Sequence, residues 1–85
     1  MKEFTYTIQD PQGMHARPAG KIAAIAQSYP GRVTRWKGEE GVDVKKLLPL
    51  IGTNLKQGDT VIIRVEGENE EQAASSMEAA FKENI

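Results

Sequence analysis

The sequence predicts a two-layer open-faced sandwich of the α/β (α+β) class, with three helices on one face of a four-stranded antiparallel sheet, in the order βαββαβα. Two observations support this class. Several segments alternate apolar and polar residues, which is typical of strands that need apolar cover on one side only. Between them lie segments whose apolar residues recur every three or four positions, so one layer of helices can provide that cover.

The expected elements follow one another without repeats or linkers. In order they are a strand over 3–8, a turn over 10–13, a helix over 18–27, hairpin strands over 33–36 and 42–44 around the loop 38–41, a short helix over 47–51, a turn over 56–59, a strand over 60–65 and a helix that opens at 69.

The first strand is indicated by Phe4, Tyr6 and Ile8, which share one face and alternate with polar residues. Asp, Pro and Gly then occupy positions of the segment 10–13 that a type I turn prefers. The helix over 18–27 is indicated by four apolar residues at helical spacing, Ala19, Ile22, Ala23 and Ala26, and the Tyr-Pro-Gly that follows ends it.

Next along the chain, the stretches 33–36 and 42–44 flank a Gly-Glu-Glu-Gly loop, which predicts a hairpin. The apolar run over 47–51 makes a helix of barely two turns, which tolerates Pro49 near its start. The strand over 60–65 has the strongest alternation, with its valines and one isoleucine facing inward. Asn69 or Glu70 is expected near the cap of the last helix.

Composition excludes several functional classes. The 85 residues suffice for one domain, over 1–85, and we expect a monomer. Eleven basic residues against twelve acidic ones give a net charge of -1, which argues against a nucleic-acid-binding module. With no cysteine and a single histidine, we expect neither a metal nor another cofactor. The absence of a signal-like or membrane-spanning stretch predicts a cytoplasmic protein without membrane insertion.

The only imidazole belongs to the run Gly-Met-His-Ala-Arg-Pro-Ala over 13–19. The helix begins either with His15 or Ala16 as its cap, or at Pro18 with Arg17 as its cap. In each register His15 lies within a turn of the positive helix end. A neutral imidazole nitrogen is a competent nucleophile, and Arg17 offers donors suited to phosphate oxygens. This arrangement suits a phosphoryl acceptor.

Residue types and spacing by themselves favour a simpler interpretation, in which His15 is a surface histidine next to a helix cap and Arg17 is a solvated charge. A hydrolase is disfavoured because no carboxylate stands beside His15 in the sequence to orient it. There is also no serine or cysteine nucleophile nearby.

The run over 13–19 resembles the active-site signature of the HPr family, the histidine-containing phosphocarrier proteins of the bacterial sugar phosphotransferase system. The resemblance covers essentially the whole chain, including the short second helix and the segment 66–73. It implies a stoichiometric carrier, not an enzyme. Such a carrier accepts a phosphoryl group from enzyme I and passes it to enzyme IIA domains. By family precedent His15 is phosphorylated through Nδ1, Arg17 contacts the phosphoryl group, and Pro18 shapes the turn.

A partner surface is expected on the second helix. Its spacing groups Leu47, Leu50 and Ile51, which leaves Leu48 the most exposed. The family pattern implies an apolar docking patch beside the histidine that meets enzyme I and the IIA domains through small, transient contacts. The residues expected there are Ala16, Arg17, Pro18, Gly20, Leu47, Leu48 and Ile51.

Two departures from the family pattern stand out. Lys46 takes the place of a serine that a kinase phosphorylates in many Gram-positive members, so that control is not expected here. Pro49 is unusual within the short helix. Two other functions stay open: a regulatory paralogue of the nitrogen-branch type with the same His15 chemistry, and a non-catalytic module that binds a regulator through its helical face. A metal- or RNA-binding sandwich is disfavoured by the charge and the few ligands.

Overall fold

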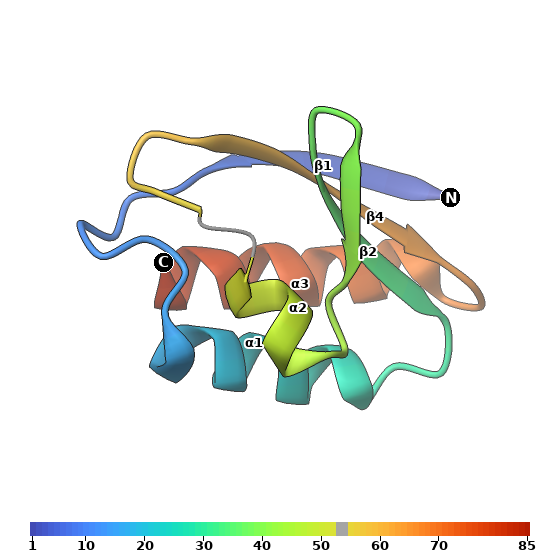
Figure 1. Cartoon of the computed structure of the whole chain (residues 1–85). Helices are drawn as coiled ribbons and strands as arrows, with labels where there is room; N and C mark the ends of the chain where they lie inside the picture. Colours follow the sequence, from blue (N-terminus) through green and yellow to red (C-terminus); the bar gives the residue numbers. More distant parts are fainter. Residues whose placement is uncertain (53–54) are drawn as a thin grey trace.

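The computed structural model describes residues 1–52 and 55–85 and confirms the predicted fold class. Figure 1 shows the sheet on one side and the helices together on the other. The elements of the described residues are β1 (Lys2–Thr7), α1 (Ala16–Gln27), β2 (Arg32–Lys37), β3 (Glu40–Asp43), α2 (Leu47–Gly52), β4 (Thr60–Glu66) and α3 (Glu70–Asn84).

The sheet has the order β1-β4-β2-β3, and every pair of neighbouring strands is antiparallel. β4 therefore lies inside the sheet, between β1 and β2. Its Val61, Ile63 and Val65 are at most 1% exposed, whereas Ile62 between them is 37% exposed. The alternation predicted for this strand is thus confirmed, and the inner face is the one that the helices cover.

The core forms where α1 and α3 pack against the inner face of the sheet. Ile22 from α1 and Phe81 from α3 are fully buried. The rings of Phe4 and Tyr6 of β1 pack edge to face with the ring of Phe81, with ring centroids 6.1 and 5.8 Å apart. Edge-to-face contacts of this kind stabilise a core beyond the area that they bury. β1 and α3, far apart in the sequence, are held together in this way.

Two predicted boundaries are wrong by a few residues. α1 begins at Ala16, two residues before Pro18, because a proline in the first helical turn lacks only an N–H that the helix would leave unpaired. The hairpin turn consists of Gly38 and Glu39 alone, and the next two residues of the expected loop belong to β3. Asn69 is the N-cap residue of α3, as the sequence predicts, although its side chain makes no capping hydrogen bond.

The short helix α2 buries only one of its apolar side chains completely. Leu50 is 0% exposed and Leu48 is 79% exposed, as the spacing predicts. The spacing groups Leu47 with Leu50 and Ile51, but Leu47 is 39% exposed and Ile51 is half-buried. A helix of six residues has too little surface for a third leucine to reach the core, so two leucines face solvent side by side.

Arg35 is the unexpected residue of the inner face. It lies on β2 opposite Val42 and Ile63, in the inward register, and is 0% exposed. None of its three guanidinium nitrogens has a hydrogen-bond partner in the part of the chain that the structure describes. Burial lowers the pKa of this guanidinium, while the charge of Glu40 acts in the opposite direction. The hydrophobic core therefore contains an unpaired cationic group.

Asp59 links the turn before β4 to the β2–β3 hairpin through hydrogen bonds. Its carboxylate accepts hydrogen bonds from the backbone N–H of Lys56 and from Nζ of Lys37, both at 2.9 Å. The backbone bond, followed by the bond from Lys37, lowers the pKa of Asp59 below its usual 3.8. A carboxyl group with a lowered folded-state pKa contributes stability above its unfolded pKa. That contribution is lost as the pH falls through the folded pKa.

We therefore expect Asp59→Asn to unfold with a weaker acid dependence than the unchanged protein below about pH 4. Urea melts at neutral pH and at several acid pH values measure the free energy of unfolding. Glu39→Gln, in the exposed hairpin turn, serves as the control and should leave the acid dependence unchanged. If the free energy of unfolding fell equally steeply with acid pH in Asp59→Asn and in the unchanged protein, this role of Asp59 would be refuted.

Candidate functional site

The loop before α1 reverses tightly and delivers His15 to the helix. Within it the N–H of Gly13 donates to the carbonyl of Asp10, and the N–H of Gln12 donates to Oδ1 of Asp10, both at 2.8 Å. Gly13 has a φ of 66°, and a Cβ there would lie 2.0 Å from the carbonyl oxygen of Leu55. Only glycine fits this position, so the path into the helix is strongly constrained.

His15 is the N-cap residue of α1, which settles the register that the sequence left open. Its backbone is extended, with φ -110° and ψ 177°, and its carbonyl accepts the first helical hydrogen bond, from Ala19 at 3.0 Å. The imidazole makes no capping bond and is 35% exposed. Among the described residues the N–H groups of Ala16 and Arg17 have no acceptor. Such N–H groups and the helix dipole favour an anion.

A carboxylate lies next to the ring. Oδ2 of Asp10 is 3.4 Å from Nε2 of His15, while Nδ1 has no hydrogen-bond partner in residues 1–52 and 55–85. The pKa of Asp10 is lowered, first by the N–H of Gln12 and then by its contact with His15. The two ring nitrogens therefore differ: one faces a negative group, and the other is available to a reactant.

The sequence reasoning missed Asp10 as part of this site. No carboxylate is adjacent to His15 in the sequence, and the pattern over 10–13 indicates only a turn that begins with Asp10. The turn itself is the signal, because a chain reversal over 10–13 brings residue 10 back towards residue 15. The structure therefore adds Asp10 to the residues expected at this site.

The surface at His15 is an open depression lined by Asp10, Gln12, His15, Ala16 and Arg17. A second depression adjoins it and adds Lys21 from α1 and Glu83 from α3. Arg17 is exposed, and its side chain makes no hydrogen bond or ion pair with any described residue. Its guanidinium is therefore free to contact the oxygens of a phosphoryl group at the helix start.

The residues expected to meet partners lie on two adjacent elements. α2 packs along α1: Gln27 donates to the carbonyl of Lys45 at 2.7 Å at one end, and Met14 donates to the carbonyl of Leu55 at 3.1 Å near the other. Their exposure differs from one residue to the next. Ala16, Arg17, Leu47 and Leu48 are exposed, Gly20 and Ile51 are half-buried, and Pro18 is buried.

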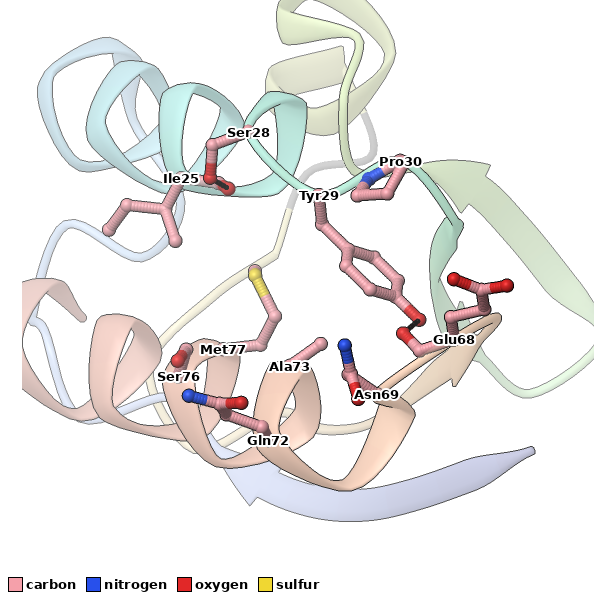
Figure 2. A pocket seen from close by; sticks show the side chains of 10 residues that line it. All are labelled: Ile25, Ser28, Tyr29, Pro30, Glu68, Asn69, Gln72, Ala73, Ser76 and Met77. Carbon is pink, nitrogen blue, oxygen red and sulfur yellow. Dashed lines mark hydrogen bonds between the residues drawn. The ribbon is translucent and has the colours of Figure 1, made fainter.

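A separate hollow of about 300 Å³ lies at the other end of α1, where it meets the start of α3. Figure 2 shows Tyr29 reaching across it, with its hydroxyl donating to the carbonyl of Glu68 at 2.8 Å. The residues that line it are Ile25, Ser28, Tyr29, Pro30, Glu68, Asn69, Gln72, Ala73, Ser76 and Met77. None of these side chains is cationic, so the hollow does not favour a phosphate.

The described residues contain no group of three or more His, Asp or Glu side chains that could hold a metal ion. Within the same residues, no helix is both long and apolar enough to cross a membrane. The two acidic residues in the first turn of α3 engage cations of the chain itself. Glu70 pairs with the amino group of Met1, and Glu71 pairs with Lys2 at 3.1 Å.

Comparisons with known proteins agree with this geometry. A protein-family model described as "PTS HPr component phosphorylation site" matches residues 2–83. The phosphocarrier protein HPr of Lysinibacillus sphaericus is 35% identical over 83 residues, which cover 98% of this chain and 94% of that protein. The phosphocarrier protein HPr of Mycoplasma pneumoniae is 33% identical over 99% of this chain and 97% of its own length. The crystal structure of HPr-C-His from Thermoanaerobacter tengcongensis superimposes with a TM-score of 0.91 at 27% identity, over 99% of this chain and 94% of that one.

Proposed function

We propose that His15 carries the phosphoryl group in this chain, which belongs to the HPr family of the phosphotransferase system. Members of this family are phosphocarriers and not catalytic enzymes. This protein is likewise a phosphocarrier. One observation carries the assignment to His15: its imidazole lies at the positive end of α1 with Nδ1 unpaired among the described residues. The chain has no other histidine.

The chemistry follows from the two ring nitrogens. The lone pair of Nδ1 attacks the phosphorus of the donor; an N–P bond forms as the bond to the donor breaks, and the donor keeps that electron pair. Nε2 keeps its proton, so the phosphorylated ring is positively charged. The N–H groups of Ala16 and Arg17 and the guanidinium of Arg17 supply donors for the phosphoryl oxygens.

The same groups allow the carrier to release the phosphoryl group. A ring protonated at Nε2 leaves as neutral imidazole when the N–P bond breaks, and the next acceptor takes the phosphorus. A serine phosphate would be a stable ester. A carrier must bind the transition state more strongly than the bound phosphoryl group, since otherwise the group would be trapped. A single arginine with two backbone N–H groups provides such limited stabilisation.

The partners of the chain are phosphotransfer proteins of the phosphotransferase system. More specifically, we assign enzyme I as the donor and enzyme IIA domains as acceptors. The accessible part of the docking patch consists of Leu47 and Leu48 on α2 with Ala16 and Arg17 on α1, flanked by the half-buried Gly20 and Ile51. Exposed leucines on the helix that packs along α1 suit brief apolar contacts with several partners in turn. Pro18 is buried and acts through the shape of the helix start.

The test is incubation of the protein with phosphoenolpyruvate and enzyme I, followed by intact mass measurement at neutral or alkaline pH. We expect one phosphoryl group that is lost in acid, as a phosphohistidine requires. The mixture without enzyme I is the control and should stay unmodified. An acid-stable phosphate, or no transfer from a competent enzyme I, would defeat the assignment.

Arg17 and Leu48 should affect different kinetic constants when this protein is the substrate of enzyme I. Arg17→Ala removes a donor to the transferring group, so we expect kcat to fall about 10–100-fold with little change in KM. Leu48→Ala removes an exposed docking contact, so KM should rise about fivefold while kcat stays the same. Initial rates at several concentrations of each variant separate the two constants. Equal kcat for Arg17→Ala and the unchanged protein would remove Arg17 from the transfer step.

A further inference from the structure

We propose that Asp10 is a positioning residue for His15, whose carboxylate holds the Nε2–H of the ring and thereby presents Nδ1 to the phosphoryl donor. This inference rests on the proposed function of His15 and assigns a role to a residue that the motif over 13–19 does not include. It starts from the contact between Oδ2 of Asp10 and Nε2 of His15 at 3.4 Å.

Asp10 is held firmly enough to orient the ring. Its N–H donates to the carbonyl oxygen of Ile85 at 2.8 Å, and its own carbonyl accepts the N–H of Gly13 at 2.8 Å. Oδ1 accepts the N–H of Gln12, also at 2.8 Å, which leaves Oδ2 directed to His15. Three hydrogen bonds therefore fix the backbone and one carboxylate oxygen of Asp10, and the side chain is only 26% exposed.

The other charged groups around the ring do not replace Asp10. Arg17 and Lys21 on α1 and Glu83 on α3 line the same two depressions. None of the three forms an ion pair with His15 or Asp10 within the described chain. Among these residues, Asp10 is the carboxylate in contact with the imidazole, so it determines which ring nitrogen carries the proton.

The carboxylate acts at two stages of transfer. Before transfer, it favours the tautomer with the proton on Nε2, so that the lone pair of Nδ1 is available for attack. After transfer, the N–P bond has formed and the ring keeps the Nε2 proton, which leaves a positive charge that Oδ2 of Asp10 stabilises. A hydrogen bond that is 3.4 Å long in the resting protein shortens when one partner becomes charged.

The informative variant is Asp10→Asn. Asparagine has the same shape, and its side-chain oxygen can still accept the N–H of Gln12, so the turn is retained. Its amide group then faces Nε2 and donates to it, which favours the wrong tautomer. We expect transfer from phosphorylated His15 to a IIA domain to slow about tenfold, the loss of roughly one charge-assisted hydrogen bond. We also expect its decline at alkaline pH to begin at a lower pH.

Asp59→Asn is the matched control. Asp59 is also 26% exposed and also accepts a backbone N–H within a turn, but it pairs with Lys37 and not with His15. Its transfer rate and pH profile should equal those of the unchanged protein. A pH profile or rate of Asp10→Asn that matches this control would overturn the proposal.

Nitrogen NMR of the unmodified protein gives a second readout that needs no variant. At a pH at which the His15 ring is neutral, we expect its proton on Nε2 in the unchanged protein. In Asp10→Asn we expect the proton on Nδ1. If the His15 proton of the unchanged protein were found on Nδ1, the role of Asp10 would be contradicted, even if Asp10→Asn failed to fold. Failure of the proposed function looks different, because the unchanged protein would then accept no phosphoryl group at all.

Discussion

His15→Ala is expected to reduce phosphorylation by enzyme I to below detection. The chain contains no second histidine, so no other imidazole can form the same nitrogen–phosphorus bond. The fold should survive, because the imidazole is 35% exposed and makes no capping bond to α1. We expect the free energy of unfolding to change by less than about 1 kcal/mol, as is usual for a substitution outside the core.

Labelled phosphoenolpyruvate measures the transfer, and urea melts confirm that the variant is folded. Gln12→Ala is a suitable control, since Gln12 lines the same depression but contributes only its backbone N–H to the site. That variant should be phosphorylated at close to the rate of the unchanged protein. Label on folded His15→Ala would show that another residue is the acceptor.

Replacement of Arg35 by methionine is expected to stabilise the protein by about 1–4 kcal/mol. Arg35 is 0% exposed, and its guanidinium has no hydrogen-bond partner in the described part of the chain. A buried charged group without partners is costly, because it has lost its hydration and gained nothing in return. Methionine has an unbranched side chain of similar length that adapts to irregular space in a core.

The measurement is the free energy of unfolding in urea, supported by thermal melts. Each kcal/mol corresponds to a rise in Tm of roughly 4–8 °C for a domain of this size. Arg64→Met is the matched control on β4. Arg64 pairs with Glu3 at 2.5 Å and lies 4.8 Å above the ring of Trp36, so its loss should destabilise by up to about 1 kcal/mol. If Arg35→Met has a lower free energy of unfolding than the unchanged protein, the guanidinium of Arg35 must be favourably paired.

Much of the fold could be predicted because local pattern and burial agree. The alternation over 60–65 identifies the inner face of β4, and the helical spacing after residue 18 identifies the buried face of α1. The exposure of Leu48 follows from the same periodicity, because a helix of two turns cannot bury every apolar side chain. The position of His15 at a helix start is also local, since it follows from the turn and the proline on either side.

Two features could not be predicted because they depend on contacts between segments. The register of β2 places Arg35 on the inner face, whereas arginine as a residue type is almost always exposed. The contact of Asp10 with His15 depends on how the turn folds back and on its bonds to Gly13 and Ile85. Both cases involve a charged side chain whose surroundings only the packed structure determines.

The central claim is that Nδ1 of His15 carries the phosphoryl group while Nε2 faces Asp10. Phosphorus and nitrogen NMR of the protein, labelled with ¹⁵N in histidine and phosphorylated by enzyme I, tests it directly. We expect one-bond coupling between phosphorus and Nδ1, with the proton on Nε2. Coupling to Nε2, or a phosphorus signal without coupling to histidine nitrogen, would contradict it.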